Sequence, residues 1–434
     1  MYKILKSLLA IAVISASFNV QALEDKLVIV TSFPKDLTKQ FKSAFEQKHP
    51  DIQVEMLKKK TTAGIKYIQE TAGNNITDLF WASAPDAFEV LKGDGLLAKY
   101  TSSVKGIPAK VGAYPINDPD GFYTGFAAAG YGIMWNTRYL KAKKIPVPSQ
   151  WSDLEKPVYH NHVGMSAPSR SGTTHLTVET LLQGDGWDKG WAKWKNIAGN
   201  FKTVTERSFG VPDGVNSGSF GIGIVIDFFG LSSKGSGFPV DFVYPHTTTL
   251  VPANIGLIKN SPHPQAAKAF IDFLLSDQGQ TILLDKKIRR LPVNPDTYTQ
   301  APADFPNPFK DSSIGSAVKF DVLLSKGRYN LVNSLFDVMI TYRLDDLRDA
   351  TKAIQDAEAA NGNARLIAEA KALVAALPIT EAQAADPAFA NIFKKKRKKA
   401  TDKVTGRQAD VEQQWDTLVK ANYAKAIELA NKAH

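Results

Sequence analysis

Short branched apolar runs alternate with helical spacing near the start of this 434-residue chain, and this alternation most constrains its fold. In residues 35–47, for example, Leu37, Phe41 and Phe45 recur on one side of a predicted helix. The predicted strands are residues 27–30, 52–56 and 78–83, and the predicted helices are residues 35–47, residues 62–71 and one opened by Pro85. Because strand–helix–strand repeats form mostly parallel sheets, the pattern predicts an α/β fold.

A second alternating set is predicted from about Gly130 to Tyr244. Its predicted elements are a strand at 164–166, a helix from Ser171 and a strand at 221–226 that ends in Asp227, followed by a strand at 255–258 and a helix at 264–275. Ligands of such sheets bind at the carboxyl ends of strands. Ser32 and Ser83 follow two of the predicted strands, so both are candidates for ligand contact.

The character of the sequence changes near residue 301. Residues 301–306 read as a Pro-containing linker, and the sequence beyond them is rich in Ala, Leu and Lys. Leu331, Leu335 and Val338 recur there at helical spacing, which predicts a helical C-terminal extension over residues 301–434. Packing on the back of a lobe or contact with a membrane partner would each explain such an extension.

Residues 1–22 have the pattern of a secretory signal peptide. Lys3 and Lys6 precede an apolar stretch that is too short to span a bilayer, and Val20-Gln21-Ala22 offers a small-residue cleavage site. Cleavage after Ala22 is therefore predicted, which would place the mature chain in the periplasm. The chain has no cysteine, and this excludes disulfides, thiolate metal sites and a lipoprotein anchor.

The chain is basic, with a formal net charge of +10 at pH 7. Residues 394–399 alone supply six consecutive cations. A basic balance fits an anionic ligand or an acidic membrane surface, although a run of this kind is more often simply solvated. Export makes nucleic acid an unexpected partner, so none is predicted.

Residues 168–175 place hydroxyls, a glycine and an arginine at the start of a predicted helix. The first N–H groups of a helix lack internal partners and favour negative charge, and an arginine fork can hold two phosphate oxygens. Asp227 could accept from a ligand hydroxyl, while Tyr244 or His175 could donate. The candidate ligand-binding residues are Ser32, Ser83, Ser169, Arg170, Ser171, Thr173, Thr174, Arg207, Asp227 and Tyr244. An ordinary N-cap, or pairing of Arg207 with Glu206 or Asp213, is the structural alternative.

Signatures of enzymes and metal sites are weak. The chain shows no nucleophile elbow, His-Glu-x-x-His helix or phosphate-binding P-loop in a suitable context, and its seven histidines are scattered. No catalytic residue, metal ligand or cofactor is predicted. A phosphoester hydrolase that uses Asp227 and Ser171 is the alternative from another functional class.

Several motifs resemble one family closely. They are Pro168-Ser169-Arg170-Ser171, Gly186-Trp187, Arg207-Ser208-Phe209-Gly210-Val211 and Val225-Ile226-Asp227, with Leu335-Phe336-Asp337 and Tyr342-Arg343-Leu344 beyond them. Through these motifs the chain resembles the bacterial extracellular solute-binding proteins, and among them the periplasmic phosphoglycerate transport regulators. The resemblance covers most of the mature chain, although it is thin in the first hundred residues.

This resemblance implies a two-lobed periplasmic binding protein of type II with a hinged cleft. Lobe I would comprise residues 23–127 and 252–300, lobe II residues 128–251, and the extension residues 301–434. The implied ligand is phosphoglycerate or phosphoenolpyruvate, bound by a monomer that contacts an inner-membrane sensor or permease. Iron, hexose phosphate and phosphonate are alternatives within the same fold. Ferric-binding relatives usually carry adjacent tyrosines, whereas this chain has Tyr244-Pro245-His246 in that neighbourhood and no Tyr-Tyr pair.

Overall fold

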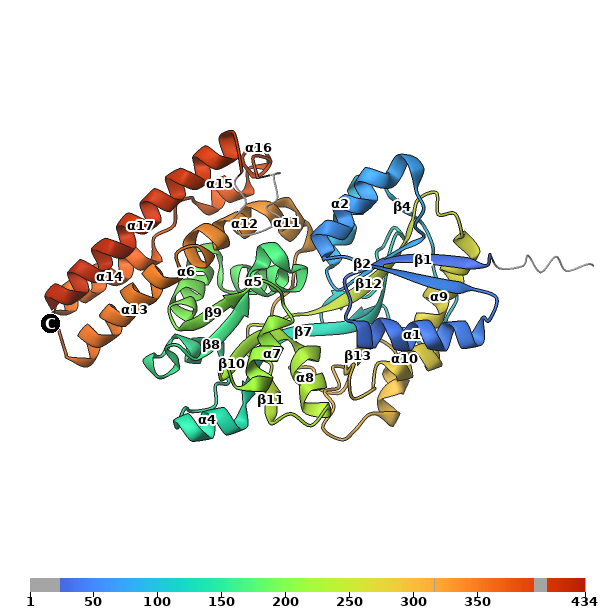
Figure 1. Cartoon of the computed structure of the whole chain (residues 1–434), viewed down its shortest axis with the longest axis horizontal. Coiled ribbons are helices and arrows are strands. Elements are labelled where there is room, and N and C mark those ends of the chain that lie inside the picture. Colours follow the sequence, from blue (N-terminus) through green and yellow to red (C-terminus); the bar gives the residue numbers. More distant parts are fainter. Residues whose placement is uncertain (1–23, 316, 394–403, 434) are drawn as a thin grey trace, which may run out of the picture.

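The structure is a computed structural model that describes residues 24–315, 317–393 and 404–433 (Figure 1). The predicted signal peptide and the lysine run at 394–399 lie outside these residues, so both stay predictions. Two α/β lobes lie side by side, and the C-terminal helices pack along the outer side of one of them (Figure 1).

Lobe I is formed by the N-terminal segment together with a later return of the chain. Its elements are β1 (Lys26–Thr31), α1 (Lys35–Lys48), β2 (Gln53–Lys58), α2 (Thr61–Thr71), a 3-10 helix (Ala72–Asn74), β3 (Leu79–Ala82), α3 (Pro85–Gly93), β4 (Leu97–Ala98), β5 (Lys110–Val111), β6 (Tyr114–Pro115), α9 (Pro264–Leu275), α10 (Asp277–Ile282), β13 (Leu291–Pro292) and a 3-10 helix (Pro295–Gln300).

Lobe II is formed by the segment between these two parts. Its elements are α4 (Thr137–Lys143), 3-10 helices at Trp151–Glu155, Pro157–Tyr159 and Pro168–Arg170, β8 (Val163–Ser166), α5 (Gly172–Asp185), α6 (Trp187–Ala198), β9 (Phe201–Thr205), α7 (Gly210–Ser217), β10 (Ile222–Ile226), α8 (Asp227–Gly235) and β11 (Val240–Val243).

Two long strands, β7 (Thr124–Asn136) and β12 (Leu250–Ile258), connect the lobes. The main strand order is β2-β1-β3-β12-β7-β10-β8-β9. The predicted parallel neighbours are confirmed, because β1 pairs in parallel with β2 and β3, and β8 pairs in parallel with β9 and β10. The prediction of a mostly parallel sheet was wrong for the sheet as a whole, which is mixed: β7 runs antiparallel to β12 and β10, and β12 runs antiparallel to β3.

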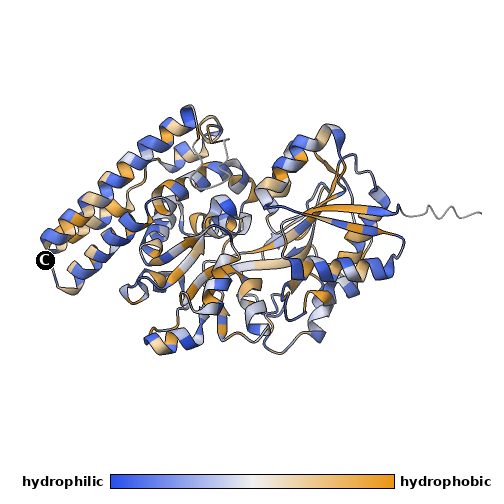
Figure 2. Ribbon diagram, in the orientation of Figure 1, coloured by the Kyte–Doolittle hydropathy of each residue, from blue (hydrophilic) through white to orange (hydrophobic). Residues whose placement is uncertain are grey.

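Strand β7 changes partners along its length, which makes it the main connection between the lobes. Residues 124–130 pair with β12, while residues 131–135 pair with β10. All 13 residues of β7 are buried. The hydrophobic strands lie between helices whose outward residues are mainly hydrophilic (Figure 2). The α/β two-lobed class is thus confirmed, and the exact lobe limits at residues 127 and 251 stay predictions.

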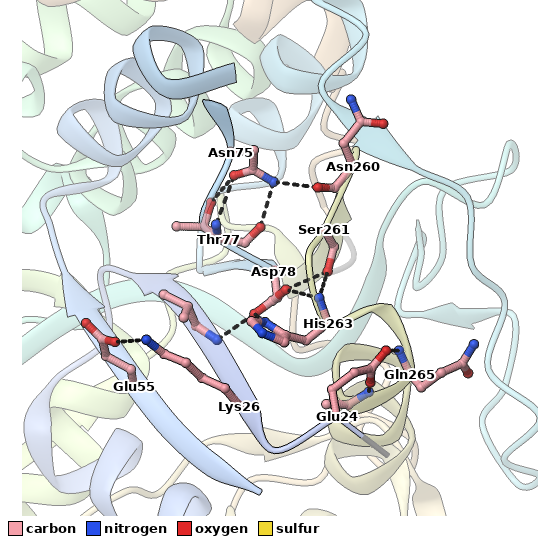
Figure 3. Close-up of polar contacts among 12 residues, drawn as sticks. Glu24, Lys26, Glu55, Asn75, Thr77, Asp78, Asn260, Ser261, His263 and Gln265 are labelled. Atoms are coloured by element: carbon pink, nitrogen blue, oxygen red, sulfur yellow. Dashed lines mark hydrogen bonds and ion pairs between the residues drawn. The ribbon is translucent and has the colours of Figure 1, made fainter. Parts of the chain in front are cut away.

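Asp78, immediately before β3, joins the amino ends of the lobe I strands (Figure 3). Its side chain is fully buried and accepts hydrogen bonds from Val28 N at 2.7 Å, Ser261 Oγ at 2.6 Å and His263 N at 2.9 Å. The ring Nδ1 of His263 lies 3.1 Å from the second carboxylate oxygen. Ser83, at the other end of β3, faces the candidate cleft, so the Asp78 cluster is a structural feature remote from it.

We expect Asp78→Ala to lower the free energy of unfolding by about 2–4 kcal/mol, because one buried and two partly buried donors would lose their acceptor. Urea denaturation measures this change. Glu55→Ala is the control, since its pair with Lys26 at 3.1 Å is half-exposed and should contribute about 0.5 kcal/mol or less. Equal losses in the two variants would show that Asp78 does not hold the strands together.

The C-terminal extension is an integral part of the lobe II core. Its elements are α11 (Val322–Gly327), α12 (Tyr329–Phe336), a π-helical turn (Asp337–Thr341), α13 (Leu344–Ala359), α14 (Ala364–Ala375), α15 (Glu381–Ala385), α16 (Pro387–Ala390) and α17 (Arg407–Ala433). One buried hydrophobic cluster contains residues of both lobe II and the extension. Within it, Trp194 of α6 contacts Phe336, with ring centroids 6.5 Å apart.

A buried lysine reinforces this attachment. Lys195 of α6 is 1 % exposed, and its ammonium donates to the carbonyls of Val374 at 2.9 Å and Ala376 at 2.5 Å, at the end of α14. Packing on the back of a lobe is therefore what the extension does, and contact with a membrane partner stays a prediction. Among the described residues, no helix combines the length and the apolar character that crossing a bilayer demands.

Candidate anion-binding cleft

The candidate site is a pocket between the lobes. Its volume is about 560 Å³, which includes the solvent-filled space at its open side. From lobe I it is lined by segments that follow the ends of β1, β2 and β3, and from lobe II by segments that follow β8, β9 and β10. This is the carboxyl edge at which open α/β sheets bind ligands. The lining residues are 32–34, 58–61, 83, 170–173, 207–209, 228, 229 and 290.

The structure brings together six of the ten residues proposed from the sequence. The six lining residues are Ser32, Ser83, Arg170, Ser171, Thr173 and Arg207. The four that do not line the pocket are Ser169, Thr174, Asp227 and Tyr244. The hydroxyl of Thr174 is directed to Ser166, and its N–H donates to Ser171 Oγ at 3.3 Å. Thr174 therefore belongs to the support of the helix start.

Asp227 and Tyr244 brace the connection between the lobes. The fully buried Asp227 carboxylate accepts from the hydroxyl of Tyr244 at 2.9 Å and from the N–H groups of Gly130 and Phe228, each at 2.7 Å. Burial raises the pKa of Asp227 to about 6, although the hydrogen bonds from Gly130 and Tyr244 oppose the rise. With its oxygens occupied in this way, Asp227 positions β7 and α8, and the ligand contact predicted for it has no geometric support.

The start of α5 supplies the hydroxyls and free amides of the site. Ser171 is the N-cap of this 14-residue helix, and its Oγ lies 2.8 Å from the Oγ1 of Thr173. The lobe I helices α1 and α2 also begin at the pocket, next to Pro34 and at Thr61, and neither has a side-chain cap. Three helix N-termini therefore present unpaired N–H groups and positive dipole ends to one space.

Among the residues that the structure describes, six cationic side chains and no carboxylate line the pocket. They are Lys58, Lys59, Lys60, Arg170, Arg207 and Arg290. The sequence analysis missed the three lysines and Arg290. Lys58 is the last residue of β2, and Lys59 and Lys60 directly follow it, so the rule that selected Ser32 and Ser83 would also have selected these lysines. Arg290 precedes the two-residue strand β13, which has no recognisable sequence pattern.

Arg290 is buried between aromatic rings of both lobes. Its guanidinium carbon lies 4.6 Å from the ring centroid of Phe33 in lobe I and 3.7 Å from that of Phe228 in lobe II. The residue is 1 % exposed, and none of its three side-chain nitrogens has a hydrogen-bond partner among the described residues. Burial lowers the pKa of Arg290 to about 9, although the charge of Asp227 opposes this.

The lobes contact each other at the rim of the pocket, and we interpret this arrangement as the closed form. Lys60 of lobe I lies 3.6 Å from Glu206 of lobe II, and the ammonium of Lys58 lies 5.9 Å from the ring centroid of Phe209. Gly172 is packed so tightly that a Cβ added there would lie 3.0 Å from the Cβ of Ala84. These contacts cross the cleft and would separate on opening.

His175, considered as a ligand donor from the sequence, lies one turn further along α5 and outside the pocket lining. It is fully buried, and its ring nitrogens lie 2.9 Å from Asn333 Oδ1 and 3.1 Å from Ser325 Oγ. The hydroxyl of Ser325 donates to Asp86 of lobe I at 3.0 Å. The extension thus joins both lobes through one polar cluster behind the cleft.

Metal binding has no structural support in the part of the chain that is described. No group of three or more His, Asp or Glu side chains comes together there in a way that could hold a metal ion. The described residues that line the pocket also include neither a tyrosine nor a carboxylate, which are the oxygen ligands that a hard metal ion prefers. The donor set instead suits an anion.

Comparisons with known proteins identify the family of the chain. The family model described as "Bacterial extracellular solute-binding protein" matches residues 74–321. The phosphoglycerate transport regulatory protein PgtC of Salmonella typhimurium is 31% identical over 383 residues, which cover 87% of this chain and 91% of that protein.

Two solved structures share the fold at low sequence identity. The periplasmic binding protein AfuA of Actinobacillus pleuropneumoniae, with exogenous fructose-6-phosphate bound, matches with a TM-score of 0.60 and 22% identity over 72% of this chain and 98% of its own. The apo ferric ion-binding protein A of Pasteurella haemolytica matches with a TM-score of 0.59 and 14% identity over 72% and 97%. The extent of the family match and the identity to PgtC show that the chain belongs to the bacterial extracellular solute-binding proteins.

Proposed function

We propose that this protein is a periplasmic receptor that binds a small phosphorylated metabolite between its lobes and serves transport or its regulation. The observation that carries the proposal is the pocket lining, in which the described part of the chain places six cations, several hydroxyls and no carboxylate. Three helix N-termini add positive potential at the same place. A multiply charged anion is the ligand that such a lining stabilises.

The phosphate would bind at the start of α5. Ser171 and Thr173 offer hydroxyls there, and the backbone N–H groups of the first helical turn point to the same region. Arg207 would approach from the segment after β9. Ser32 and Ser83 would complete the shell from lobe I, so that the ligand bridges both lobes and stabilises the closed form.

The chemical class of the ligand follows from two relatives. PgtC is named for phosphoglycerate transport regulation, and AfuA was solved with fructose-6-phosphate bound. Phosphoglycerate and phosphoenolpyruvate are therefore the first candidates. Members of the family work with membrane transporter or sensor components, and an inner-membrane sensor or permease is the partner that we propose.

Isothermal titration of the chain from residue 23 with 3-phosphoglycerate, phosphoenolpyruvate, fructose 6-phosphate, methylphosphonate and ferric citrate tests the proposal. We expect saturable binding of phosphoesters without release of phosphate. Ser171→Ala combined with Arg207→Ala should weaken that binding by about 30-fold, since charge-assisted hydrogen bonds would be lost. Ser217→Ala with Arg138→Ala, two exposed lobe II positions outside the pocket, is the matched control.

Three outcomes would contradict the proposal. Binding of ferric citrate alone would favour an iron carrier, and steady release of phosphate would favour the hydrolase. Undiminished phosphoester binding by the double variant would place the ligand elsewhere in the molecule.

A further inference from the structure

We infer that Arg290 is the binding site for a second anionic group, a carboxylate, and that it selects phosphorylated carboxylic acids over phosphorylated alcohols and sugars. The inference rests on the proposed function, because it assigns the other end of the same ligand. Its starting point is the side chain of Arg290, which reaches the pocket with all three nitrogens unpaired among the described residues.

Without a ligand, a buried guanidinium that lacks hydrogen-bond partners lowers the stability of the protein. Five N–H donors have been removed from water without a hydrogen-bonded acceptor in return, and burying an unpaired charge is among the largest penalties in a folded chain. Asp227 is the carboxylate whose charge acts on Arg290, and it already accepts hydrogen bonds from Gly130, Phe228 and Tyr244. No ion pair within 4.0 Å joins Asp227 to Arg290 in the described structure. An anionic group of the ligand is the partner that the pocket can admit.

The surroundings of Arg290 favour a carboxylate. Phe33 and Phe228 flank the guanidinium, and Phe229 also lines the pocket, so this end of the site is largely apolar. A carboxylate is smaller than a phosphate and carries one charge, so it loses less hydration on entering such a place. Its two oxygens also match the planar fork of arginine in a bidentate pair. A dianionic phosphate is better accommodated at the start of α5, where Ser171 and Thr173 offer hydroxyls and the helix dipole favours negative charge.

The backbone geometry indicates that the surrounding structure holds the side chain of Arg290 in a fixed position. Arg289 has a φ of 45°, in the left-handed region that a residue with a side chain rarely adopts. Such strain persists where the surrounding structure requires it, often next to functional side chains. The N–H of Arg290 then donates to Leu283 O at 3.0 Å, which fixes the direction in which the side chain leaves the backbone. Because Phe33 and Phe228 come from different lobes, closure completes the surroundings of the guanidinium.

The test compares ligands that differ at one group. 3-Phosphoglycerate carries phosphate and carboxylate, glycerol 3-phosphate lacks the carboxylate, and a three-carbon bisphosphate replaces the carboxylate by phosphate. We expect the unaltered protein to bind 3-phosphoglycerate about 30-fold more tightly than either of the others in isothermal titration. Arg290→Met should abolish this preference by weakening 3-phosphoglycerate alone, while glycerol 3-phosphate affinity stays within about threefold.

Arg207→Met is the matched control. Arg207 is an exposed cation at the rim, and its loss should weaken the three ligands by similar factors. Arg290→Met should also keep its fold, with a thermal midpoint without ligand at least as high as that of the parent, because a buried unpaired charge has been removed. If Arg290 only stabilised the fold, Arg290→Met would instead lower the thermal midpoint.

The outcomes separate this inference from the proposed function. Equal affinity of the parent for 3-phosphoglycerate and glycerol 3-phosphate overturns the role of Arg290 and leaves the receptor for phosphorylated metabolites standing. A preference for the bisphosphate, or equal losses for all ligands in Arg290→Met, likewise overturns the carboxylate assignment. Absence of binding by every phosphoester overturns the proposed function itself.

Discussion

Arg328→Met is expected to lower the free energy of unfolding by about 3–5 kcal/mol at neutral pH, because it would leave Glu179 charged and unpaired in the core. Arg328 precedes α12 and donates to Glu179 of α5 through Nε at 2.9 Å and Nη2 at 2.8 Å. The two side chains are 3 % and 0 % exposed. Urea denaturation measures the loss, and the same variant tests whether the extension is anchored on the ligand-binding helix.

The pH dependence of this loss follows from Glu179. Burial alone would raise the pKa of Glu179, but Arg328 outweighs it and holds the pKa below the ordinary value of 4.5. The pair therefore stabilises the parent above about pH 4.5, and its contribution disappears as pH falls through the lowered pKa. In Arg328→Met the carboxyl is buried without a cation, so it becomes neutral at a higher pH. The difference in the free energy of unfolding between parent and variant should consequently become smaller in acid.

Glu179→Leu combined with Arg328→Met is the control for this interpretation. Replacing both partners by apolar residues removes the uncompensated charge, so most of the lost stability should return. A single variant that stays within about 1 kcal/mol of the parent, or a double variant no better than the single one, would contradict the assignment of a buried pair.

Gly172→Trp is expected to weaken phosphoester binding by roughly 1,000-fold, or about 4 kcal/mol, because an indole at this position cannot fit in the closed form. Gly172 is the first residue of α5. Even a Cβ there would lie 3.0 Å from the Cβ of Ala84 and 3.4 Å from Thr61 of the opposite lobe. Isothermal titration gives the affinity, and small-angle X-ray scattering reports whether ligand still makes the molecule more compact.

Gly73→Trp in lobe I is the matched control, since a Cβ placed there would have open space around it among the described residues. It should bind and close like the parent. If Gly172→Trp bound phosphoester with parental affinity, ligand binding would not require the lobe contact seen in the structure. Weak binding with normal compaction would place the effect of the indole in the pocket alone.

Much of the fold could be predicted because its signals are local. Helix α9 has the predicted bounds, Pro264–Leu275, and the strand at 164–166 lies within β8. Strand β7 was missed because its sequence is rich in Gly and Ala and has only two β-branched residues, Thr124 and Ile133. Those small residues serve close packing, since a Cβ on Gly132 would lie 2.2 Å from the carbonyl oxygen of Val243.

The parts of the site that could be predicted are those whose residues lie together in one short segment of the sequence. Ser171 and Thr173 share a short stretch with a helix start, and both line the pocket. Arg290 could not be found in this way, because its meaning depends on burial between Phe33 and Phe228 from distant parts of the chain. The position of Asp227 could not be interpreted from the sequence either, because its hydrogen-bond partners include a residue from a distant part of the chain. A carboxylate at a strand end resembles a ligand contact until its partners in β7 are known.

The central claim is that a phosphorylated metabolite binds between the lobes with its phosphate at the start of α5. A crystal structure of the protein grown with saturating 3-phosphoglycerate tests this most directly. The account predicts a closed form with phosphate oxygens in hydrogen-bond contact with Ser171 and Thr173 and with the carboxylate at Arg290. A closed or open form with this pocket empty of ligand, or with the phosphate held elsewhere, would contradict it.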